Sequence, residues 1–243
     1  MPKILLAKEG KTFFVKDETK DYHTQFGFVK AKDFKKKDGS KVKTNMDIEL
    51  TLFTSNFIDD YKRIKRAPQI IPRKDVAAIV AETGVSKKSI IVDAGGGSGA
   101  LASFLANIAK QVTTYEIRED FYKIIQKNKK FLNLTNLKIK NKNIYQGIEE
   151  KNVDLITLDL PSPWNAIKPA EGALKVGGFI VSYSPTIPQV MDFVSMIEKT
   201  PNLIHLKTLE IIQREWDVEE RKVRPKSQPI GHSGFLTFVR KVS

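Results

Sequence analysis

A glycine-rich turn between two short apolar segments constrains this chain more than any other feature. It follows Ser89–Asp93, where three β-branched residues in a row are typical of a strand buried on both faces. The turn itself consists of Gly95, Gly96, Gly97, Ser98 and Gly99. Glycine tolerates positive φ and lets the backbone pass close to a neighbour, so this turn is predicted to be tight.

A helix over Ala100–Ala109 and a second strand over Val112–Tyr115 are predicted to follow, and Glu116 ends that strand. This order is typical of the first half of a nucleotide-binding α/β unit, which consists of a strand, a glycine turn, a helix, a second strand and a carboxylate. The carboxylate of such a unit accepts hydrogen bonds from ribose hydroxyls. The spacing Gly95-x-Gly97-x-x-Ala100 also fits the loose dinucleotide fingerprint. The glycines alone therefore do not distinguish a site for a nicotinamide cofactor from a site for S-adenosylmethionine. The alternative is a turn that binds no ligand and has only a structural role.

Length and composition limit the remaining possibilities. The 243 residues have room for one α/β domain and a small accessory domain, and 41% hydrophobic residues are typical of a folded protein. There is no run of about 18 apolar residues and no segment resembling a signal peptide. Cysteine is absent, which excludes disulfides, thiolate metal sites and a cysteine nucleophile. We expect a cytoplasmic protein and no metal site.

The charge balance favours a polyanionic partner. Lysine and arginine number 41 against 28 aspartate and glutamate residues, a net charge of +13. Basic side chains that neutralise phosphates release counterions and so gain salt-sensitive affinity for nucleic acid. The alternative is a lysine-rich surface that serves solubility, and charge alone does not decide between the two.

Residues 1–60 are predicted to form a small antiparallel β barrel or sandwich. Its strands are expected at Lys3–Lys8, Lys11–Lys16, Phe26–Ala31 and Asp47–Phe53. The segment Asp33–Asn45 is rich in lysine. This domain is interpreted as a nucleic-acid grip, with a stability or oligomerisation module as the alternative.

Two helices are predicted to connect this domain to the rest. Tyr61–Arg66, preceded by two aspartates, is expected to be a short helix that Ala67-Pro68 ends. Arg73–Thr83 is expected to be a longer helix that Gly84 closes.

The second domain, residues 61–243, alternates between predicted strands and helices. After Glu116, strands are expected at Leu137–Lys142, Val153–Leu160, Gly177–Tyr183, Leu203–Ile212 and Gly234–Arg240. Helices are expected at Glu119–Leu132, which has a lysine-rich outer face, Ile167–Leu174 and Pro188–Lys199. This pattern predicts an α/β fold with a mostly parallel, doubly wound sheet of seven strands.

Ligands of such sheets bind beyond the carboxyl ends of the strands. The most informative of these ends is Asp159-Leu160-Pro161-Ser162-Pro163-Trp164. Asp159 closes a buried strand, the prolines force an extended or turn backbone, and Trp164 offers a surface on which a base can stack. The amino group of an adenine can donate to the carboxylate or to an exposed carbonyl there. The alternative is a strand-capping aspartate beside a core tryptophan.

The chain resembles tRNA (adenine-N1)-methyltransferases that modify adenosine 58 in the T-loop, in their single-gene prokaryotic form. The resemblance runs along nearly the whole chain. It rests on Tyr22-His23-Thr24, Ala67-Pro68-Gln69-Ile70-Ile71 with Lys74-Asp75, Ala94-Gly95 to Leu101, Tyr115-Glu116-Ile117-Arg118-Glu119, Leu158-Asp159-Leu160-Pro161, Arg224-Pro225 and Gly231-His232-Ser233-Gly234-Phe235-Leu236. Each motif is weak alone, but their order and spacing together are specific.

The resemblance implies a Rossmann-like methyltransferase domain of the class I type, S-adenosylmethionine as cofactor, tRNA as substrate and a homotetramer. The residues that it assigns to the cofactor, in addition to the glycine turn and Asp159, are Gln69, Ile71, Glu116, Ile117, Asn143 and Ile144. It implies that Asp159 holds the N6 amino group of the target adenine. Pro161, Trp164, Arg224 and His232 are the expected substrate-binding residues.

Four positions depart from the family pattern. Pro72 stands where the family has a tyrosine near the target base, and Gly96 stands where threonine is usual. Asn143 and Ser162 replace acidic residues that are common there, while Asp159 is retained.

Three other classes of function are alternatives to this interpretation. A non-catalytic RNA-binding subunit of the same fold would lack the glycine turn and the aspartate. A nicotinamide-dependent oxidoreductase would need a hydride-transfer site, for which no Tyr-x-x-x-Lys or histidine dyad is placed. A small-molecule methyltransferase would need neither the basic N-terminal domain nor the C-terminal motif.

Overall fold

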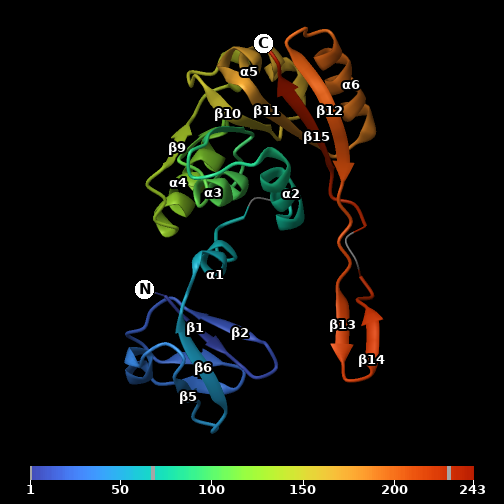
Figure 1. Cartoon of the computed structure of the whole chain (residues 1–243). Coiled ribbons are helices and arrows are strands. Elements are labelled where there is room, and N and C mark those ends of the chain that lie inside the picture. The colour runs from blue at the N-terminus through green and yellow to red at the C-terminus, as the bar shows by residue number, and fades with distance from the viewer. Residues whose placement is uncertain (1, 67–68, 229–230) are drawn as a thin grey trace. The chain divides into compact units, whose positions relative to one another are not determined.

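The computed structural model describes residues 2–66, 69–228 and 231–243, and the chain divides into two compact units, Met1–Arg63 and Ile64–Ser243. Figure 1 shows the course of the chain through both units. No helix among the described residues combines the length and the apolar character that crossing a membrane requires.

The first unit is built around a four-stranded antiparallel sheet with the order β2-β1-β6-β5. Its strands are β1 (Lys3–Leu6), β2 (Thr12–Val15), β5 (Lys41–Lys43) and β6 (Glu49–Thr54). A hairpin of β3 (Tyr22–Thr24) and β4 (Gly27–Val29) and the 3₁₀ helix η1 (Ala31–Lys35) complete it. Phe34 is fully buried among the aliphatic residues of this sheet, so the unit has a core of its own.

The predicted helix Tyr61–Arg66 is wrong, because the helix lies earlier, as α1 (Phe57–Tyr61). Asn56 caps it by accepting hydrogen bonds from the backbone N–H groups of Ile58 (3.0 Å) and Asp59 (3.2 Å). The Asp59 carboxylate accepts in return from the Asn56 N–H at 3.1 Å, which completes a capping box. The helix stop predicted at Ala67-Pro68 lies outside the described residues.

The second unit contains a seven-stranded sheet with the order β12-β15-β11-β10-β7-β8-β9. The strands are β7 (Ile90–Ala94), β8 (Gln111–Tyr115), β9 (Leu137–Lys140), β10 (Val153–Leu158), β11 (Leu174–Ser184), β12 (Leu203–Glu210) and β15 (Phe235–Lys241). Six of these strands run in the same direction, and β15 alone runs in the opposite one, antiparallel to both β11 and β12. The predicted mostly parallel sheet of seven strands is therefore confirmed.

Helices cover both faces of this sheet (Figure 1). On one face α2 (Arg73–Thr83), α3 (Ala100–Ala106) and α4 (Glu119–Phe131) share one hydrophobic core with the sheet. On the other face α5 (Ile167–Ala173) and α6 (Ile187–Glu198) share a second core with it. The sheet is thus doubly wound, as its apolar strands require for burial on both sides.

The strand order reverses between β7 and β10. The chain runs outward from β7 through β8 to β9 and then returns to place β10 on the other side of β7, with Ala94 beside Leu158. Such a reversal leaves a crevice between the loops at the carboxyl ends of the two strands. The glycine turn and Asp159 follow these two strand ends directly.

One hairpin was not predicted from the sequence. It consists of β13 (Trp216–Glu219) and β14 (Lys222–Pro225), and all of its residues are exposed. Its strands do alternate between apolar and polar residues, with Trp216 opposite Pro225 and Val218 opposite Val223 on one face, so the period-2 pattern was present in the sequence and was overlooked.

Candidate functional site

A cavity of about 630 Å³ opens at the carboxyl edge of the seven-stranded sheet. Residues that follow β7, β8, β9, β10 and β11 line it. This volume lies within the usual range of roughly 300–1,000 Å³ for small-molecule sites. The sheet edge predicted to carry the chemistry is therefore the edge that holds the cavity.

The glycine turn forms the inner wall of this cavity. Gly95 has φ +83° and lies so close to the strand end of β10 that an added Cβ would be 1.9 Å from the carbonyl oxygen of Asp159. Gly97 has φ +53° and faces the cavity, where a Cβ would meet only one atom, 3.8 Å away. The turn therefore joins the two strand ends at the crevice and leaves backbone exposed to a ligand.

Glu116 lies across from this turn at the end of β8. Its carboxylate accepts hydrogen bonds from the N–H of Gly97 at 2.7 Å and from the N–H of Arg118 at 2.8 Å. The side chain is buried at 6% exposure but still lines the cavity. A carboxylate offers about four acceptor positions, so Glu116 keeps capacity for hydroxyl donors from a ligand.

The predicted cofactor residues beyond β8 and β9 also line the cavity. Ile117 is 66% exposed, and Asn143 begins the 3₁₀ helix η2 (Ile144–Gln146) by accepting from the N–H of Tyr145 at 3.0 Å. The guanidinium of Arg118 stacks 3.9 Å from the ring centre of Phe121, and both side chains belong to the same wall. This wall is apolar with amide groups at its edge, which suits an aromatic ring with polar substituents.

Asp159 lies at the end of β10, where its N–H donates to the carbonyl oxygen of Ala94 at 2.9 Å. Asp159 is exposed to solvent through the cavity, and the surrounding protein partly desolvates its carboxyl group. This desolvation, with a smaller contribution from the charge of Asp93, raises the pKa of Asp159 to about 7. The carboxyl group is thus poised between its two protonation states near neutral pH.

Asp93 lies beneath the site, buried at 2% exposure. It accepts hydrogen bonds from the hydroxyls of Thr114 at 2.7 Å and Thr157 at 2.8 Å, which fix it between β8 and β10. Burial raises the pKa of Asp93 more than these bonds lower it. Its charge, when present, opposes ionisation of Asp159.

The loop after Asp159 forms the remaining wall. Pro161 lines the cavity, and its carbonyl oxygen accepts a hydrogen bond from the side chain of Gln189 at 3.2 Å. Gln189 also accepts from the Thr186 hydroxyl at 2.9 Å and lines the cavity itself. It therefore connects the start of α6 to the loop that carries Asp159.

Gln189 and Pro185 in the cavity wall were not predicted from the sequence. Both follow β11, which ends at Ser184 on the same edge of the sheet as β7, β8 and β10. The end of this strand is the sequence feature that indicates them.

Several of the predicted site residues lie outside the cavity wall. Ile71 is buried in the core beneath α2, and Ser98, buried at 2% exposure, accepts through its carbonyl from the side chain of Asn128. Gly96 and Gly99 form the back of the turn, close to Ile125. Their roles toward a cofactor stay predictions.

The predicted substrate residues are spread more widely. Trp164 lies in the 3₁₀ helix η3 (Pro163–Ala166), half buried against the second core, and Arg224 lies on the exposed strand β14. His232 is closer to the site, because its Nε2 lies 2.9 Å from the carbonyl oxygen of Pro185 and its Nδ1 lies 2.6 Å from Glu210. The hydrogen bond to Glu210, followed by the bond to Pro185, raises the pKa of His232.

A buried polar cluster holds the neighbouring C-terminal segment. The ammonium group of Lys74 lies 2.7 Å from the carboxylate of Asp75 and 2.6 Å from the hydroxyl of Ser233. That hydroxyl donates to Asp75 at 2.8 Å, and the carbonyl of Ser233 accepts from Tyr183. The cluster joins α2 to residues 231–234, which are thereby fixed beside the end of β11.

Comparison with known proteins adds to this geometry. A family described as tRNA methyltransferase complex GCD14 subunit matches residues 62–224. The chain is 33% identical to a tRNA (adenine(57)-N(1)/adenine(58)-N(1))-methyltransferase, TrmI, of Methanocaldococcus jannaschii, over 98% of this chain and 94% of that protein. It is 30% identical to tRNA (adenine(58)-N(1))-methyltransferase TrmI of Thermus thermophilus, over 84% of this chain and 81% of that protein.

Solved structures agree with these relatives. A SAM-dependent O-methyltransferase of Thermotoga maritima superposes with a TM-score of 0.89 at 29% identity, over 100% of this chain and 93% of that one. The tRNA methyltransferase TrmI of Aquifex aeolicus gives 0.83 at 25% identity, over 100% and 97%. The Rossmann-like class I methyltransferase fold with a small N-terminal β domain is confirmed, and the chain belongs to the tRNA methyltransferase family described as the GCD14 subunit.

Proposed function

We propose that this protein transfers a methyl group from S-adenosylmethionine to N1 of adenosine 58 in the T-loop of tRNA, with adenosine 57 as a second target to be tested. One observation carries the proposal. The carboxyl group of Asp159 lies in the cavity directly beside the glycine turn, with its backbone carbonyl held against Gly95. A cofactor on the glycine turn and a base at Asp159 would therefore meet within one site.

The residues present fit S-adenosylmethionine. Gly97 leaves open backbone toward the cavity, Glu116 keeps acceptor capacity for ribose hydroxyls, and Asn143 and Ile117 form an amide and apolar edge for an adenine ring. The cofactor supplies an electrophilic methyl group on a positively charged sulfonium. Gln69 lines the same cavity and is assigned to the methionine side.

The task of the protein is to hold adenine N1 in line with that methyl group, because N1 is a weak nucleophile that is normally paired or stacked. We assign Asp159 to accept a hydrogen bond from the adenine N6 amino group. As positive charge develops on the methylated ring, the ionised carboxylate stabilises it. Pro161 and Leu160 exclude water from the base on one side, and Gln189 keeps their loop in position.

The remaining parts of the proposal rest on the sequence. The lysine-rich η1–β5 region supports assigning the N-terminal unit to grip tRNA, and the sequence motifs support assigning Arg224, His232 and Trp164 to the RNA side of the site. A homotetramer and a cytoplasmic location are proposed from the same motifs and from the composition.

Two measurements on the whole chain test this function. Calorimetric titration with S-adenosylmethionine should show binding by the wild type and by Asp159→Asn, and clearly weaker binding by Glu116→Gln. With labelled cofactor and unmodified tRNA, Asp159→Asn should lose about 100- to 1,000-fold in kcat, as for removal of one transition-state contact. Full activity of this variant would refute the role of Asp159, and absence of cofactor binding by the wild type would favour a non-catalytic RNA-binding subunit.

A further inference from the structure

The segment between Asp120 and Glu149 contains lysine as its only charged residue type. Its seven lysines are Lys123, Lys127, Lys129, Lys130, Lys138, Lys140 and Lys142, and it has no aspartate, glutamate or arginine. The segment forms most of α4, the edge strand β9 and the 3₁₀ helix η2. One side of the second unit therefore carries a concentrated positive charge.

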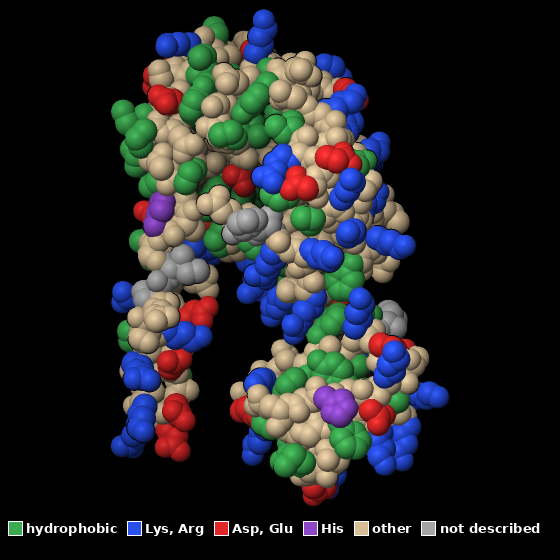
Figure 2. All heavy atoms as spheres, turned by 180° about the vertical axis from the view of Figure 1, so that it is seen from behind, with side chains coloured by type: hydrophobic (Ala, Val, Ile, Leu, Met, Phe, Trp, Pro, Cys, Tyr) green, Lys and Arg blue, Asp and Glu red, His purple; other side chains and the backbone are tan. Residues whose placement is uncertain are grey.

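Three of these lysines are neutralised by neighbours and four are not. Lys123 pairs with Glu119, and Lys140 and Lys142 pair with the glutamates that end the segment. The other four, which make no ion pair with any residue that the structure describes, are Lys127, Lys129, Lys130 and Lys138. In the rear view, Lys and Arg side chains predominate along the side that carries α4 and β9 (Figure 2).

A concave surface lies within this basic segment. It is a groove of about 680 Å³ along one stripe of α4, bordered by β9. Its polar side chains are those of Tyr122, Gln126, Lys129, Lys130, Asn133 and Thr135. The first four recur at helical spacing on one face of α4, and the last two follow the end of the helix. The groove thus combines ammonium, amide and hydroxyl groups with one aromatic ring.

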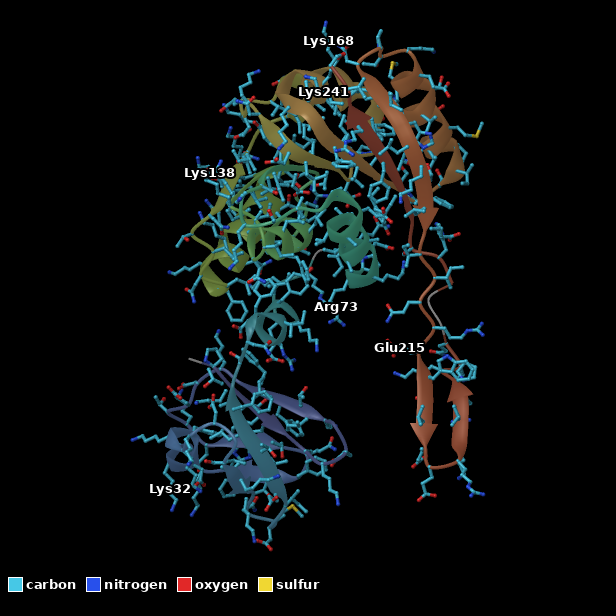
Figure 3. All side chains as sticks on the ribbon, viewed as in Figure 1. Lys32, Arg73, Lys138, Lys168, Glu215 and Lys241 are labelled. Carbon is cyan, nitrogen blue, oxygen red and sulfur yellow. The ribbon has the colours of Figure 1, made fainter. Side chains whose placement is uncertain are left out.

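This α4–β9 groove shares its supporting elements with the cavity. Phe121 lines the cavity and the next residue, Tyr122, lines the groove. Likewise Lys142, just beyond β9, lines the cavity, whereas Ile139 within β9 lines the groove. Figure 3 shows Lys138 on the outer side of the same strand. A polymer with one residue in the cavity can therefore continue along α4.

We propose that the α4–β9 groove binds the sugar–phosphate backbone of the tRNA whose adenosine enters the cavity. The proposal rests on the proposed function for the identity of the RNA. Unpaired lysines neutralise phosphates, amides and hydroxyls bond phosphate and ribose oxygens, and Tyr122 provides a surface for an unstacked base.

An anionic membrane surface is the other polyanion that such a charge attracts, and the groove suits it less. Membrane-surface segments combine basic residues with exposed large apolar side chains that enter the lipid. Among the described residues, none of the strongly exposed large hydrophobic side chains lies between Arg118 and Lys175. A concave polar groove without an apolar anchor fits an RNA backbone better than a flat lipid surface.

The test compares two double variants with the same change in net charge. Lys129→Gln/Lys130→Gln removes unpaired charge that lines the groove. Lys168→Gln/Lys199→Gln removes two exposed lysines in α5 and at the end of α6, helices that cover the other face of the sheet. For both full-length variants and the wild type, the Kd for unmodified tRNA is measured by fluorescence anisotropy over a series of salt concentrations, and the Kd for S-adenosylmethionine by calorimetry.

We expect the groove variant to bind tRNA roughly 10-fold more weakly at moderate salt, with a log Kd versus log salt slope smaller by about 2, because two phosphate contacts are lost. Its KM for tRNA should rise, while kcat at saturating tRNA and the cofactor Kd stay at wild-type values. The control variant should change tRNA affinity less than about 3-fold.

Equal losses in both variants would overturn the proposal, since a diffuse charge effect would then explain the binding. Unchanged tRNA binding by the groove variant, with lost binding to phosphatidylserine vesicles, would overturn it in favour of a lipid surface. The proposed function fails separately: if the wild type binds tRNA through the groove but does not methylate it, the groove stands and the enzymatic proposal falls.

Discussion

At the scale of single residues, the site depends on two carboxyl groups in contrasting surroundings. Asp93 is enclosed by protein and held by two threonine hydroxyls, whereas Asp159 faces the cavity without such partners among the described residues. Burial raises the pKa of both. Carboxyl groups with shifted pKa values gather at functional sites, and Asp159, which lines the cavity without a side-chain hydrogen-bond partner in the described part of the chain, is the stronger candidate of the two.

The raised pKa of Asp159 predicts the pH dependence of methyl transfer. The proposed active form is the ionised carboxylate, and the pKa of about 7 means that this form is lost as the pH falls through 7. We expect kcat/KM to fall about 10-fold per pH unit below that midpoint and to level off above it. Asp93→Asn should move the midpoint to lower pH by removing the nearby charge. A profile that stays flat between pH 5.5 and 8 would contradict this role.

The same shift predicts a cost in stability. The folded pKa of about 7 lies above the ordinary value of 3.8, so the folded protein loses stability as the pH rises from about 4 to 7. Asp159→Asn remains neutral and should unfold at a higher temperature than the wild type at pH 8, with the difference vanishing near pH 4. Thermal unfolding at both pH values checks the sign. A variant less stable than the wild type at pH 8 would show that burial does not destabilise this carboxylate.

Gly95 is predicted to be irreplaceable by alanine. Its positive φ and the 1.9 Å approach of a new Cβ to the Asp159 carbonyl would force the two strand ends apart. We expect Gly95→Ala to destabilise the protein by about 3 kcal/mol and to reduce methyl transfer, measured by chemical denaturation and activity. Gly172→Ala is the matched control, because Gly172 lies in α5 with no atom within 4 Å of its new Cβ. It should cost no stability.

At the scale of elements, α4 carries more of the site than its sequence suggests. Asn128, buried at 2% exposure, donates to the carbonyl oxygens of Ser98 and Lys65 at 2.8 Å each. Its own side-chain oxygen accepts from the N–H of Lys65 at 2.8 Å. One side chain therefore ties the helix to the glycine turn and to the segment that leads into the domain.

Replacement of Asn128 should be costly for this reason. Asn128→Ala leaves two carbonyls and one N–H without their partner in a buried place, which predicts a loss of about 3 kcal/mol in unfolding free energy. Gln126→Ala on the exposed side of the same helix should change it by less than about 0.5 kcal/mol. Chemical denaturation of both variants checks this, and equal effects would contradict the structural role of Asn128.

Much of the fold could be predicted from the sequence, because buried parallel strands are short apolar runs and their helices are amphipathic. The misplaced helix at Tyr61–Arg66 arose from weighing the two aspartates by charge alone, although Asn56 is the stronger start signal. The wall at Gln189 and Pro185 escaped prediction because only the end of β11, and no motif, indicates it. Contacts such as that of Gly95 with Asp159 depend on the distance between strands, which sequence spacing does not give.

At the scale of the whole molecule, the protein carries a net charge of +13, and some of its lysines form ion pairs while others do not. Some lysines of the second unit, such as Lys175 and Lys207, pair with acidic residues, whereas Lys129 and Lys130 in the α4–β9 groove form no ion pair with any described residue. A surface with unpaired positive charge beside a cavity of about 630 Å³, with room for a cofactor and a base, is the arrangement that a tRNA methyltransferase needs. The fold and the relatives therefore lead to the same substrate.

The most direct test of this account maps the methylated atom. The full-length protein, S-adenosylmethionine and an unmodified tRNA transcript are incubated, and the product is digested and analysed by mass spectrometry and primer extension. The account predicts 1-methyladenosine at position 58 and its disappearance in a transcript with guanosine at that position. Methyl transfer to another atom, or undiminished transfer to a transcript with no adenosine at positions 57 and 58, would contradict it.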